Sequence, residues 1–307
     1  MRVGVRVIKQ LTAPFPYFGG KRRVALLVWE RFGAVANYVE PFFGSGAVLL
    51  GRPGGARGIE NVNDADGYVV NFWRALRSEP DWLQDQTSRM PSLEADLHAW
   101  GDYLAKNRGE VTEKLRADPR WYDRELAAWW VWGVSASIGH SWPRERFGEM
   151  PSNHPGGVLS QRDLGPLSVR MSKVRVLCGD WSRIVKVGTM RHQASEASGE
   201  SVSGVFFDPP YIDGDMAYGT TTQDEHASIF ADVCRWCEEH GEDPKLRIAL
   251  CGYEGTWDPP ATWSTVAWKA RGGYGNQSGG KAGNTNAKRE RIWFSPACLD
   301  ASQASLW

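Results

Sequence analysis

Two stretches near the N-terminus constrain the fold of this chain most, because each joins a short apolar run to a helical pattern through a turn. Residues 35–46 (VANYVEPFFGSG) indicate a strand and a glycine-containing turn, and an apolar helical segment follows at 47–50. Residues 58–62 (GIENV) indicate a second short strand, which Asn63 and Asp64 follow before an apolar helix at 67–76. Strands that alternate with helices in this way are typical of a parallel α/β sheet.

The same alternation returns in the second half of the chain, after a long stretch of different character. Residues 79–169 contain polar helical patterns, an apolar helix candidate at 127–138 and a loop-like segment rich in Gly, Pro, Ser and Asn. We therefore predict an α/β protein whose sheet domain, residues 1–78 and 170–307, is interrupted by a mainly helical insertion. The predicted strands are residues 35–40, 58–62, 174–178, 202–207, 246–250, 262–268 and 290–294.

A rigid turn, Asp208-Pro209-Pro210-Tyr211, directly follows the predicted strand at 202–207. Two adjacent prolines have fixed φ angles and no N–H donors, so they neither extend the strand nor begin an ordinary helix. The turn therefore projects a carboxylate, a backbone carbonyl and an aromatic ring from the carboxyl end of a strand. Open α/β sheets bind their ligands at that edge, which makes this tetrapeptide the strongest candidate for a functional site.

The net charge of zero, from 36 basic and 36 acidic residues, hides strongly polarised segments. Residues 1–31 carry seven basic groups and one acid, and residues 268–291 carry six basic groups and one acid. Residues 194–243 carry twelve acids and a single arginine. Because the local distribution of charge steers a polyanion, the neutral total does not exclude a nucleic-acid partner.

Five cysteines, an odd number, do not indicate a disulfide framework. Cys234 and Cys237 form a C-x-x-C pair, but no second ligand pair stands at zinc spacing, so we expect small buried thiols on a helix face and no metal. No signal-peptide core and no apolar run of membrane-spanning length is present. These features predict a soluble cytoplasmic protein without a membrane partner.

Five segments, taken in order, resemble the Dam-type (D12 class) DNA adenine-N6 methyltransferases and in particular their phage and prophage relatives. They are YFGGK at residues 17–21, EPFFGSG at 40–46, ND at 63–64, DPPY at 208–211 and ERIWFSP at 290–296. The resemblance implies a Rossmann-like methyltransferase sheet that uses S-adenosylmethionine, with a target-recognition domain in the insertion. It also implies a site-specific enzyme that methylates N6 of an adenine flipped out of duplex DNA. A monomer is expected, and a cognate restriction endonuclease is one partner that such an enzyme can have.

The resemblance also implies a cofactor site around the glycine turn. Gly44 and Gly46 allow a tight turn and close approach to the cofactor, and the following helix N-terminus favours a carboxylate. The third glycine of a dinucleotide fingerprint is absent, since position 49 is Leu, which disfavours NAD. Asp64 and Asp180 are each expected either to contact the cofactor or to cap a helix. The implied cofactor-binding residues are Tyr17, Phe18, Gly19, Lys21, Glu40, Pro41, Phe42, Gly44, Gly46, Asp64, Asp180 and Asp208.

The implied catalytic residues are Asp208, Pro209, Pro210 and Tyr211. The Asp208 carboxylate and the Pro209 carbonyl would each accept one N6 hydrogen of adenine, and Tyr211 would stack on the flipped base. Methylation of RNA adenine or of cytosine N4 by the same fold is an alternative, although such enzymes tend to begin the tetrapeptide with Asn or Ser. A non-catalytic DNA-binding relative is a further alternative, but it would need a damaged tetrapeptide or glycine turn.

Contacts with DNA are expected from the insertion loop and from the basic segment near the C-terminus. Trp129, Trp130 and Trp132 are expected to form the core of the insertion, whereas Trp142 lies in a loop beside two arginines. That loop departs from the Asn/Arg-rich hairpin of GATC-specific family members, so the resemblance does not imply a GATC target. The predicted DNA-binding residues are Trp142, Arg144, Arg146, Lys281, Lys288 and Arg289, with Arg170, Lys173, Arg175 and Arg271 as further basic candidates.

Overall fold

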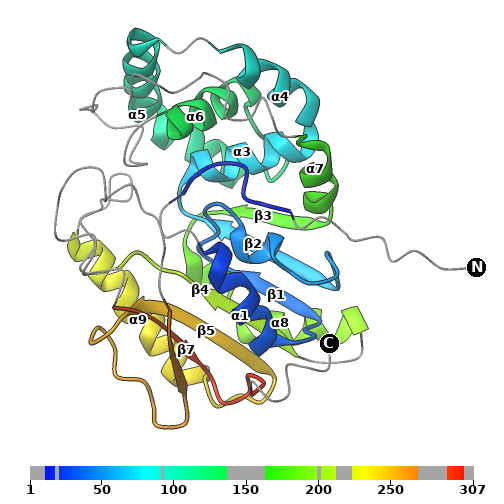
Figure 1. The fold of residues 1–307 in the computed structure, drawn as a ribbon, viewed down its shortest axis with the longest axis vertical. Helices are drawn as coiled ribbons and strands as arrows, with labels where there is room; N and C mark the ends of the chain where they lie inside the picture. The colour runs from blue at the N-terminus through cyan, green and yellow to red at the C-terminus, as the bar shows by residue number, and fades with distance from the viewer. Residues whose placement is uncertain are drawn as a thin grey trace, which may run out of the picture.

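The structure, a computed structural model, describes residues 11–17, 21–90, 93–136, 163–198, 202–211, 223–268 and 289–300. In this part of the chain a seven-stranded sheet runs through the middle of the molecule in the order β3-β2-β1-β4-β5-β7-β6 (Figure 1). The strands are β1 Asn37–Glu40, β2 Ile59–Asp64, β3 Val174–Cys178, β4 Ser203–Phe207, β5 Leu246–Tyr253, β6 Ser264–Ala267 and β7 Glu290–Phe294. The α-helices are α1 Arg22–Phe32, α2 Ala47–Leu50, α3 Gly67–Ser78, α4 Pro80–Arg89, α5 Glu94–Ala117, α6 Arg124–Ala136, α7 Gly165–Met171, α8 Val187–Ser198 and α9 Gln223–His240.

The strand order creates one position where a ligand can enter. Strands β3, β2, β1, β4 and β5 are parallel, and β7 and β6 add an antiparallel edge. Chain connections leave β1 toward β2 and β3 on one side, whereas β4 and β5 lie on the other. The order therefore reverses between β1 and β4, and their carboxyl ends flank the crevice where α/β sheets of this kind bind ligands.

Alternating side chains on the strands build two apolar cores, one on each face of the sheet. Tyr38 and Phe206 pack with α1, α3 and the helices of the insertion, whereas Val39 and Phe207 pack with α8 and α9. Because successive strand residues point to opposite faces, a continuous apolar strand can serve both cores. The mixed α/β class with a mostly parallel sheet confirms the predicted fold class, a Rossmann-like arrangement.

Helices α4 to α7 gather with α3 beyond the β3 edge of the sheet, at the top of Figure 1. Arg74 of α3 is buried and donates to the carbonyls of Leu115, Asp118 and Trp121, which close the C-terminal end of α5 and the turn after it. These carbonyls lack partners within the helix, so the guanidinium satisfies them. Trp130 and Trp132 are buried in the core that α3 shares with the sheet, whereas Trp129 is partly buried and stacks on Trp100 with 4.4 Å between centroids.

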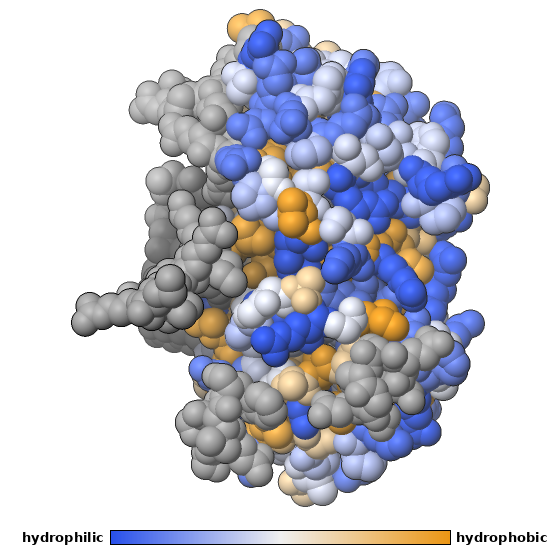
Figure 2. All heavy atoms as spheres, turned by 90° about the vertical axis from the view of Figure 1, so that its right-hand side faces the viewer, coloured by the Kyte–Doolittle hydropathy of each residue, from blue (hydrophilic) through white to orange (hydrophobic). Residues whose placement is uncertain are grey.

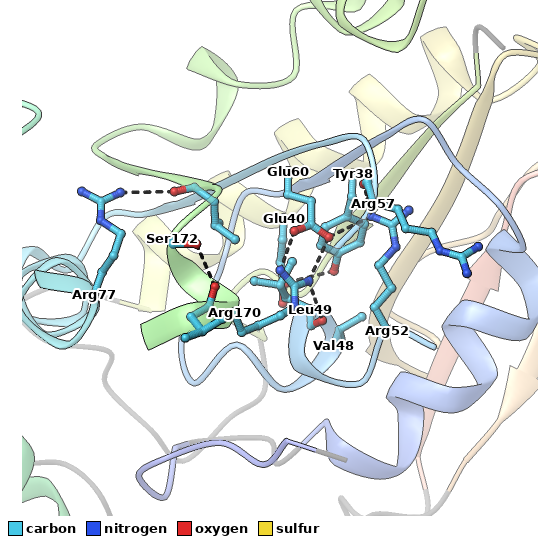
Figure 3. A network of polar contacts seen from close by, with 12 residues as sticks. Tyr38, Glu40, Val48, Leu49, Arg52, Arg57, Glu60, Arg77, Arg170 and Ser172 are labelled. Carbon is cyan, nitrogen blue, oxygen red and sulfur yellow. Dashed lines mark hydrogen bonds and ion pairs between the residues drawn. The ribbon is translucent and has the colours of Figure 1, made fainter. Parts of the chain in front are cut away.

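A buried cluster of charged side chains joins α7 and the turn after α2 to strand β2 (Figure 3). Glu60, on β2, accepts hydrogen bonds from Arg52, in the turn after α2, and from Arg170, on α7, at 2.5–2.8 Å. All three side chains are at most 7% exposed. Arg170 was a basic candidate for DNA contact, and that prediction is wrong. Its guanidinium is buried and donates hydrogen bonds to Glu60 and to the Leu49 carbonyl.

Most strands lie where the sequence predicts them, and the differences have local causes. The predicted β7 is reproduced, whereas β2 and β5 extend two and three residues past their predicted ends to the carboxyl edge. Helix α1 was not predicted, although its buried residues Val24, Val28, Trp29 and Phe32 have helical spacing. The basic residues of 1–31 lie between those apolar positions, so the helical pattern was not recognised in the sequence. The division into a sheet domain and a target-recognition domain stays a prediction.

Within the described ranges, no helix has the length and apolar character needed to cross a membrane. Figure 2 shows hydrophilic side chains over most of the described part of one face, with apolar side chains scattered between them.

Candidate functional site

Three carboxyl groups lie at the carboxyl ends of β1, β2 and β4, at or beside the reversal of the strand order. Glu40 ends β1, Asp64 ends β2, and Asp208 follows β4 directly. Burial raises the pKa of Glu40 well above its usual range, and the charges of Asp208 and Asp64 add to the rise, whereas the hydroxyl of Tyr38, 2.8 Å from Glu40 Oε2, opposes it. Burial raises the pKa of Asp64 to about 7, and neighbouring Asp66 adds to that rise. The edge therefore concentrates acidic groups whose raised pKa values favour the neutral form, and a cationic ligand there would favour their ionised form.

The glycine turn after β1 is fixed from both sides. The Gly44 N–H donates to Asp64 Oδ2 at 2.8 Å, and the Gly44 carbonyl accepts from the Trp73 indole at 2.9 Å. Gly44 and Gly46 have φ angles of +47° and +67°, in the left-handed region that favours glycine. A Cβ on Gly44 would lie 2.6 Å from the ring of Tyr17, so the turn is packed against one of the predicted cofactor-binding aromatics.

Replacing Gly46 by Ala tests this turn. A left-handed backbone costs a non-glycine residue about 1–2 kcal/mol, and a Cβ at Gly46 would also lie 2.7 Å from the Phe43 ring. Gly55→Ala is the matched control, because Gly55 has a φ of +78° and nothing within 4 Å of an added Cβ. In urea unfolding, Gly46→Ala is expected to lose more free energy of unfolding than Gly55→Ala. Equal losses in the two variants would contradict the tight packing of the turn.

Asp64 and Asp180 were each predicted to contact a cofactor or to cap a helix, and the structure treats them differently. Asp64 does not cap α3, since the cap is Asp66, whose carboxylate accepts from the Tyr68 N–H. Asp64 instead accepts from the backbone N–H groups of Gly44 and Asp66. Asp180 caps the short 3-10 helix Trp181–Arg183 through the Ser182 N–H, and its side chain is exposed beyond the carboxyl end of β3.

The segment between β1 and the glycine turn is held between neighbouring elements. The Pro41 carbonyl accepts from the side-chain amide of Asn63, which also donates to the Gly179 carbonyl and so links the ends of three strands. The Phe42 ring stacks on Trp181 with 6.3 Å between centroids. This packing places both residues at the carboxyl edge, beside the turn in which their cofactor role is predicted.

The tetrapeptide at residues 208–211, the predicted catalytic segment, contacts a lysine 187 positions before Asp208 in the sequence. Lys21 Nζ lies 2.9 Å from Asp208 Oδ1 and 2.9 Å from the Tyr211 hydroxyl, which in turn donates to Asp208 Oδ1 at 3.1 Å. Burial lowers the pKa of Lys21, but the charges of Asp208, Cys251 and Glu290 outweigh burial and raise it. The lysine therefore carries its charge inside the protein, against the candidate catalytic carboxylate.

This position of Lys21 differs from the predicted one. The sequence suggested a contact with the carboxylate of a cofactor or with DNA, whereas the side chain is only 6% exposed and faces Asp208. Lys21 precedes α1 directly, so the packing of that helix on the sheet carries the ammonium to the end of β4. The apolar spacing of α1 would have indicated its burial, but no local pattern indicates which carboxylate the lysine meets.

Three further residues beside the tetrapeptide escaped the sequence analysis. Tyr253, at the end of β5, packs edge-on against Tyr211 with 4.6 Å between centroids. Cys251 and Glu290 are buried nearby and act electrostatically on Lys21. Strand alternation could have placed Cys251 and Tyr253 on one face, but the antiparallel pairing that brings Glu290 opposite Tyr253 is not readable from either strand.

Several predicted site residues lie outside the described residues. Arg289 is described, and its guanidinium lies over the Tyr253 ring, 5.5 Å from the centroid, close to the tetrapeptide. Those outside the described residues are Phe18, Gly19, Trp142, Arg144, Arg146, Arg271, Lys281 and Lys288.

The C-x-x-C pair lies on α9 as two buried thiols, as predicted. Cys234 and Cys237 belong to the apolar core between α9 and the sheet, and burial raises the pKa of Cys234 to about 12. A thiol in such surroundings stays protonated and behaves as a small apolar side chain. Across the described ranges, no group of three or more His, Cys, Asp or Glu side chains is arranged to hold a metal ion.

Comparison with known proteins finds a family that matches the N-terminal part of the chain. Residues 17–128 match the family described as D12 class N6 adenine-specific DNA methyltransferase. No curated protein matches the chain. The matched segment contains Lys21, the glycine turn, Asp64 and helices α3 to α5, while the tetrapeptide lies beyond it. Residues 17–128 therefore match a D12 class N6 adenine-specific DNA methyltransferase domain, and this match and the fold indicate an enzyme that methylates N6 of adenine in DNA.

Proposed function

We propose that S-adenosylmethionine binds at the carboxyl ends of β1, β2 and β3, around the glycine turn. The concentration of carboxylates at this edge is the observation that carries the proposal. S-adenosylmethionine supplies an electrophilic methyl group on a positively charged sulfur, and it also has an ammonium group. A cationic ligand favours the ionised form of Glu40 and Asp64, and the resulting carboxylates complement both cationic groups.

Within this site each residue has a separate part. Asp64 faces the ribose diol, because a carboxylate has about four acceptor positions and the two backbone donors occupy only part of them. The exposed Asp180 faces the adenine edge of the cofactor. Tyr17 packs on Gly44 and lines the turn. Helix α2 is a single turn, so the backbone N–H groups of the glycine turn itself would meet a carboxylate.

We propose that the target adenine binds at Asp208, Pro209 and Tyr211. N6 is a poor nucleophile because its lone pair is delocalised into the ring. Asp208 and the Pro209 carbonyl hold its two hydrogens, which raises the electron density on N6 and favours a pyramidal nitrogen. Tyr211 supplies the aromatic surface on which a base that has left the duplex can stack. The rigid proline pair and the buried end of β4 hold these groups in place before the base arrives.

Mapping of modified bases tests this function. DNA from cells that express the protein is read by long-read sequencing that detects methylated bases. The expected result is methylation of adenine N6 within one recurring sequence, and cells expressing Asp208→Ala serve as the control. Modification of cytosine alone, or none at all, would contradict the proposal. The recurring sequence also supplies the DNA substrate for the experiments below, and testing it as a duplex and as single strands decides which form the enzyme uses.

The raised pKa of Asp64 predicts a pH dependence of cofactor affinity. A carboxylate that accepts the ribose hydroxyls must be ionised, and a group with a pKa of about 7 is ionised in only about one tenth of molecules at pH 6. The dissociation constant of S-adenosylmethionine, measured by calorimetry, is expected to rise about tenfold between pH 8 and pH 6. Asp64→Asn should remove this difference, and its own profile corrects for titration of the ligand.

An Asp64→Asn profile as steep as that of the wild type would show that another group is responsible.

The same raised pKa affects the stability of the fold, which falls with rising pH, whereas the affinity for the cofactor rises. A folded-state pKa above the unfolded value favours the protonated folded state, so the contribution is fully present below the unfolded pKa of about 4 and is lost as the pH rises through about 7.

A further inference from the structure

Glu290 is a buried carboxylate that the reaction proposed above does not use. Its side chain is 6% exposed, and its Oε2 atom has no hydrogen-bond partner among the described residues. A buried charged oxygen without a partner is costly, so its presence beside the functional edge needs a physical reason.

The pairing of β5 with β7 places Glu290 on the same face of the sheet as the tetrapeptide. Glu290 lies opposite Tyr253 in that register. Directly opposed residues of an antiparallel pair point to the same face. Tyr253 in turn contacts Tyr211, whose hydroxyl is hydrogen-bonded to Asp208. Glu290 is therefore on the side of the sheet where Lys21 and Asp208 meet.

The ammonium of Lys21 lies between two aromatic rings, one next to Asp208 and the other next to Glu290. Its ammonium is 5.0 Å from the centroid of Tyr211, on the Asp208 side, and 5.3 Å from the centroid of Trp268. Trp268 is on the Glu290 side, since its backbone N–H donates to the Glu290 carbonyl. The ammonium is therefore already within cation–π distance of a ring in each direction.

The electrostatics of the pair agree with this geometry. Burial raises the pKa of Glu290 to about 7, and the charge of Lys21 opposes that rise. Lys21 has three N–H donors, of which Asp208 and Tyr211 account for two. Both Glu290 and Lys21 thus have capacity for a further hydrogen bond, and each favours the charged form of the other.

Asp208 cannot serve the ammonium and the target amine equally well. The positive charge of Lys21 beside Asp208 Oδ1 draws electron density toward itself. The carboxylate then increases the electron density on N6 less than a free carboxylate would. A buried ammonium that simply leaves Asp208 would lose its counter-ion, which is strongly unfavourable in a protein interior. Glu290 is a second carboxylate whose charge already acts on Lys21, so it is a candidate to offset that cost.

We propose that Glu290 is the second counter-ion of Lys21 and takes the ammonium from Asp208 when the target adenine enters. The proposal rests on the assignment of Asp208 to N6 given above. Lys21 turns from the Tyr211 side toward the Trp268 side, and Glu290 Oε2 accepts one of its N–H groups. No covalent bond changes in this step. Glu290 is a positioning residue, because it acts on the reaction only through Lys21.

Two substitutions at Glu290 separate charge from shape. Glu290→Gln keeps the shape and removes the charge, whereas Glu290→Asp keeps the charge and shortens the side chain. The single-turnover rate of methyl transfer is measured at pH 8 on DNA that carries the mapped sequence. Glu290→Gln is expected to lose about tenfold or more, the effect of one charge-assisted hydrogen bond. Glu290→Asp is expected to stay closer to the wild type, and the affinity of both variants for S-adenosylmethionine should be nearly unchanged.

A Lys21→Met background provides the second measurement, because Glu290 has no ammonium to receive there. Glu290→Gln is expected to add little to the effect of Lys21→Met. Three outcomes would overturn the inference: a wild-type rate in Glu290→Gln, a larger loss in Glu290→Asp than in Glu290→Gln, or the same loss from Glu290→Gln in both backgrounds. Asp208→Ala is assayed alongside. Activity in that variant would overturn the proposed function itself, whereas an inactive Asp208→Ala with any of these three outcomes overturns only the role of Glu290.

Discussion

Asp208→Ala is expected to abolish methyl transfer, with a loss of at least about a thousandfold, while the affinity for S-adenosylmethionine largely survives. Removing one preorganised group that stabilises a transition state typically costs a factor of about 10²–10³. Asp208 is expected to exceed that range, because it both orients the amine and raises its electron density. The rate is measured as transfer of a labelled methyl group to DNA that carries the mapped sequence.

Two controls keep a failure of folding from imitating this result. Asp208→Asn has the same shape and removes only the charge that faces Lys21, so an inactive and stably folded Asp208→Asn would locate the loss in the carboxylate. Asp232→Ala removes an exposed acid of α9 that pairs with Arg235, and it should leave the rate unchanged. Wild-type activity in Asp208→Ala would refute the mechanism, since no other described carboxylate follows β4 directly.

Glu60→Gln is expected to destabilise the fold by about 3–5 kcal/mol, the loss that follows when one partner of a buried ion pair is removed. Glu60 is the carboxylate that two buried guanidiniums share, and a neutral amide would leave both Arg52 and Arg170 without a counter-ion (Figure 3). Arg170 ties α7, the helix that follows the insertion, to Glu60 on β2. The variant should therefore also loosen the packing of α7. The free energy of unfolding is measured in urea.

Glu113→Gln is the matched control for that substitution. Glu113 pairs with Arg116 on the exposed side of α5, where solvent screens the charges and little stability depends on the pair. A Glu60→Gln variant that unfolds at the same urea concentration as the wild type would show that the guanidiniums find other partners. The carbonyls of Val35, Arg57 and Leu49 already accept hydrogen bonds from them, but carbonyls do not neutralise their charge.

The parts of the fold that sequence predicted best are those with local causes. The strands before the two functional turns, the glycine turn itself and helix α9 follow from apolar runs and from Gly and Pro, which act within a few residues. The parts missed, α1, α7 and α8, are short or carry charges that mask one apolar face. Arg170 illustrates the same limit, because its sequence neighbours are basic and only the folded chain shows Glu60 beside it.

The sequence by itself determined the α/β alternation and the positions of the acids at the ends of β1, β2 and β4, because strands and rigid turns are encoded locally. It also predicted the carboxyl edge as the functional edge. Only the tertiary structure decided which side chains meet across that edge. Lys21 lies on Asp208, and Glu290 lies on the same face, because α1 packs on the sheet and β7 pairs with β5. These contacts join residues far apart in the chain, and their geometry depends on packing and register, which no single segment specifies.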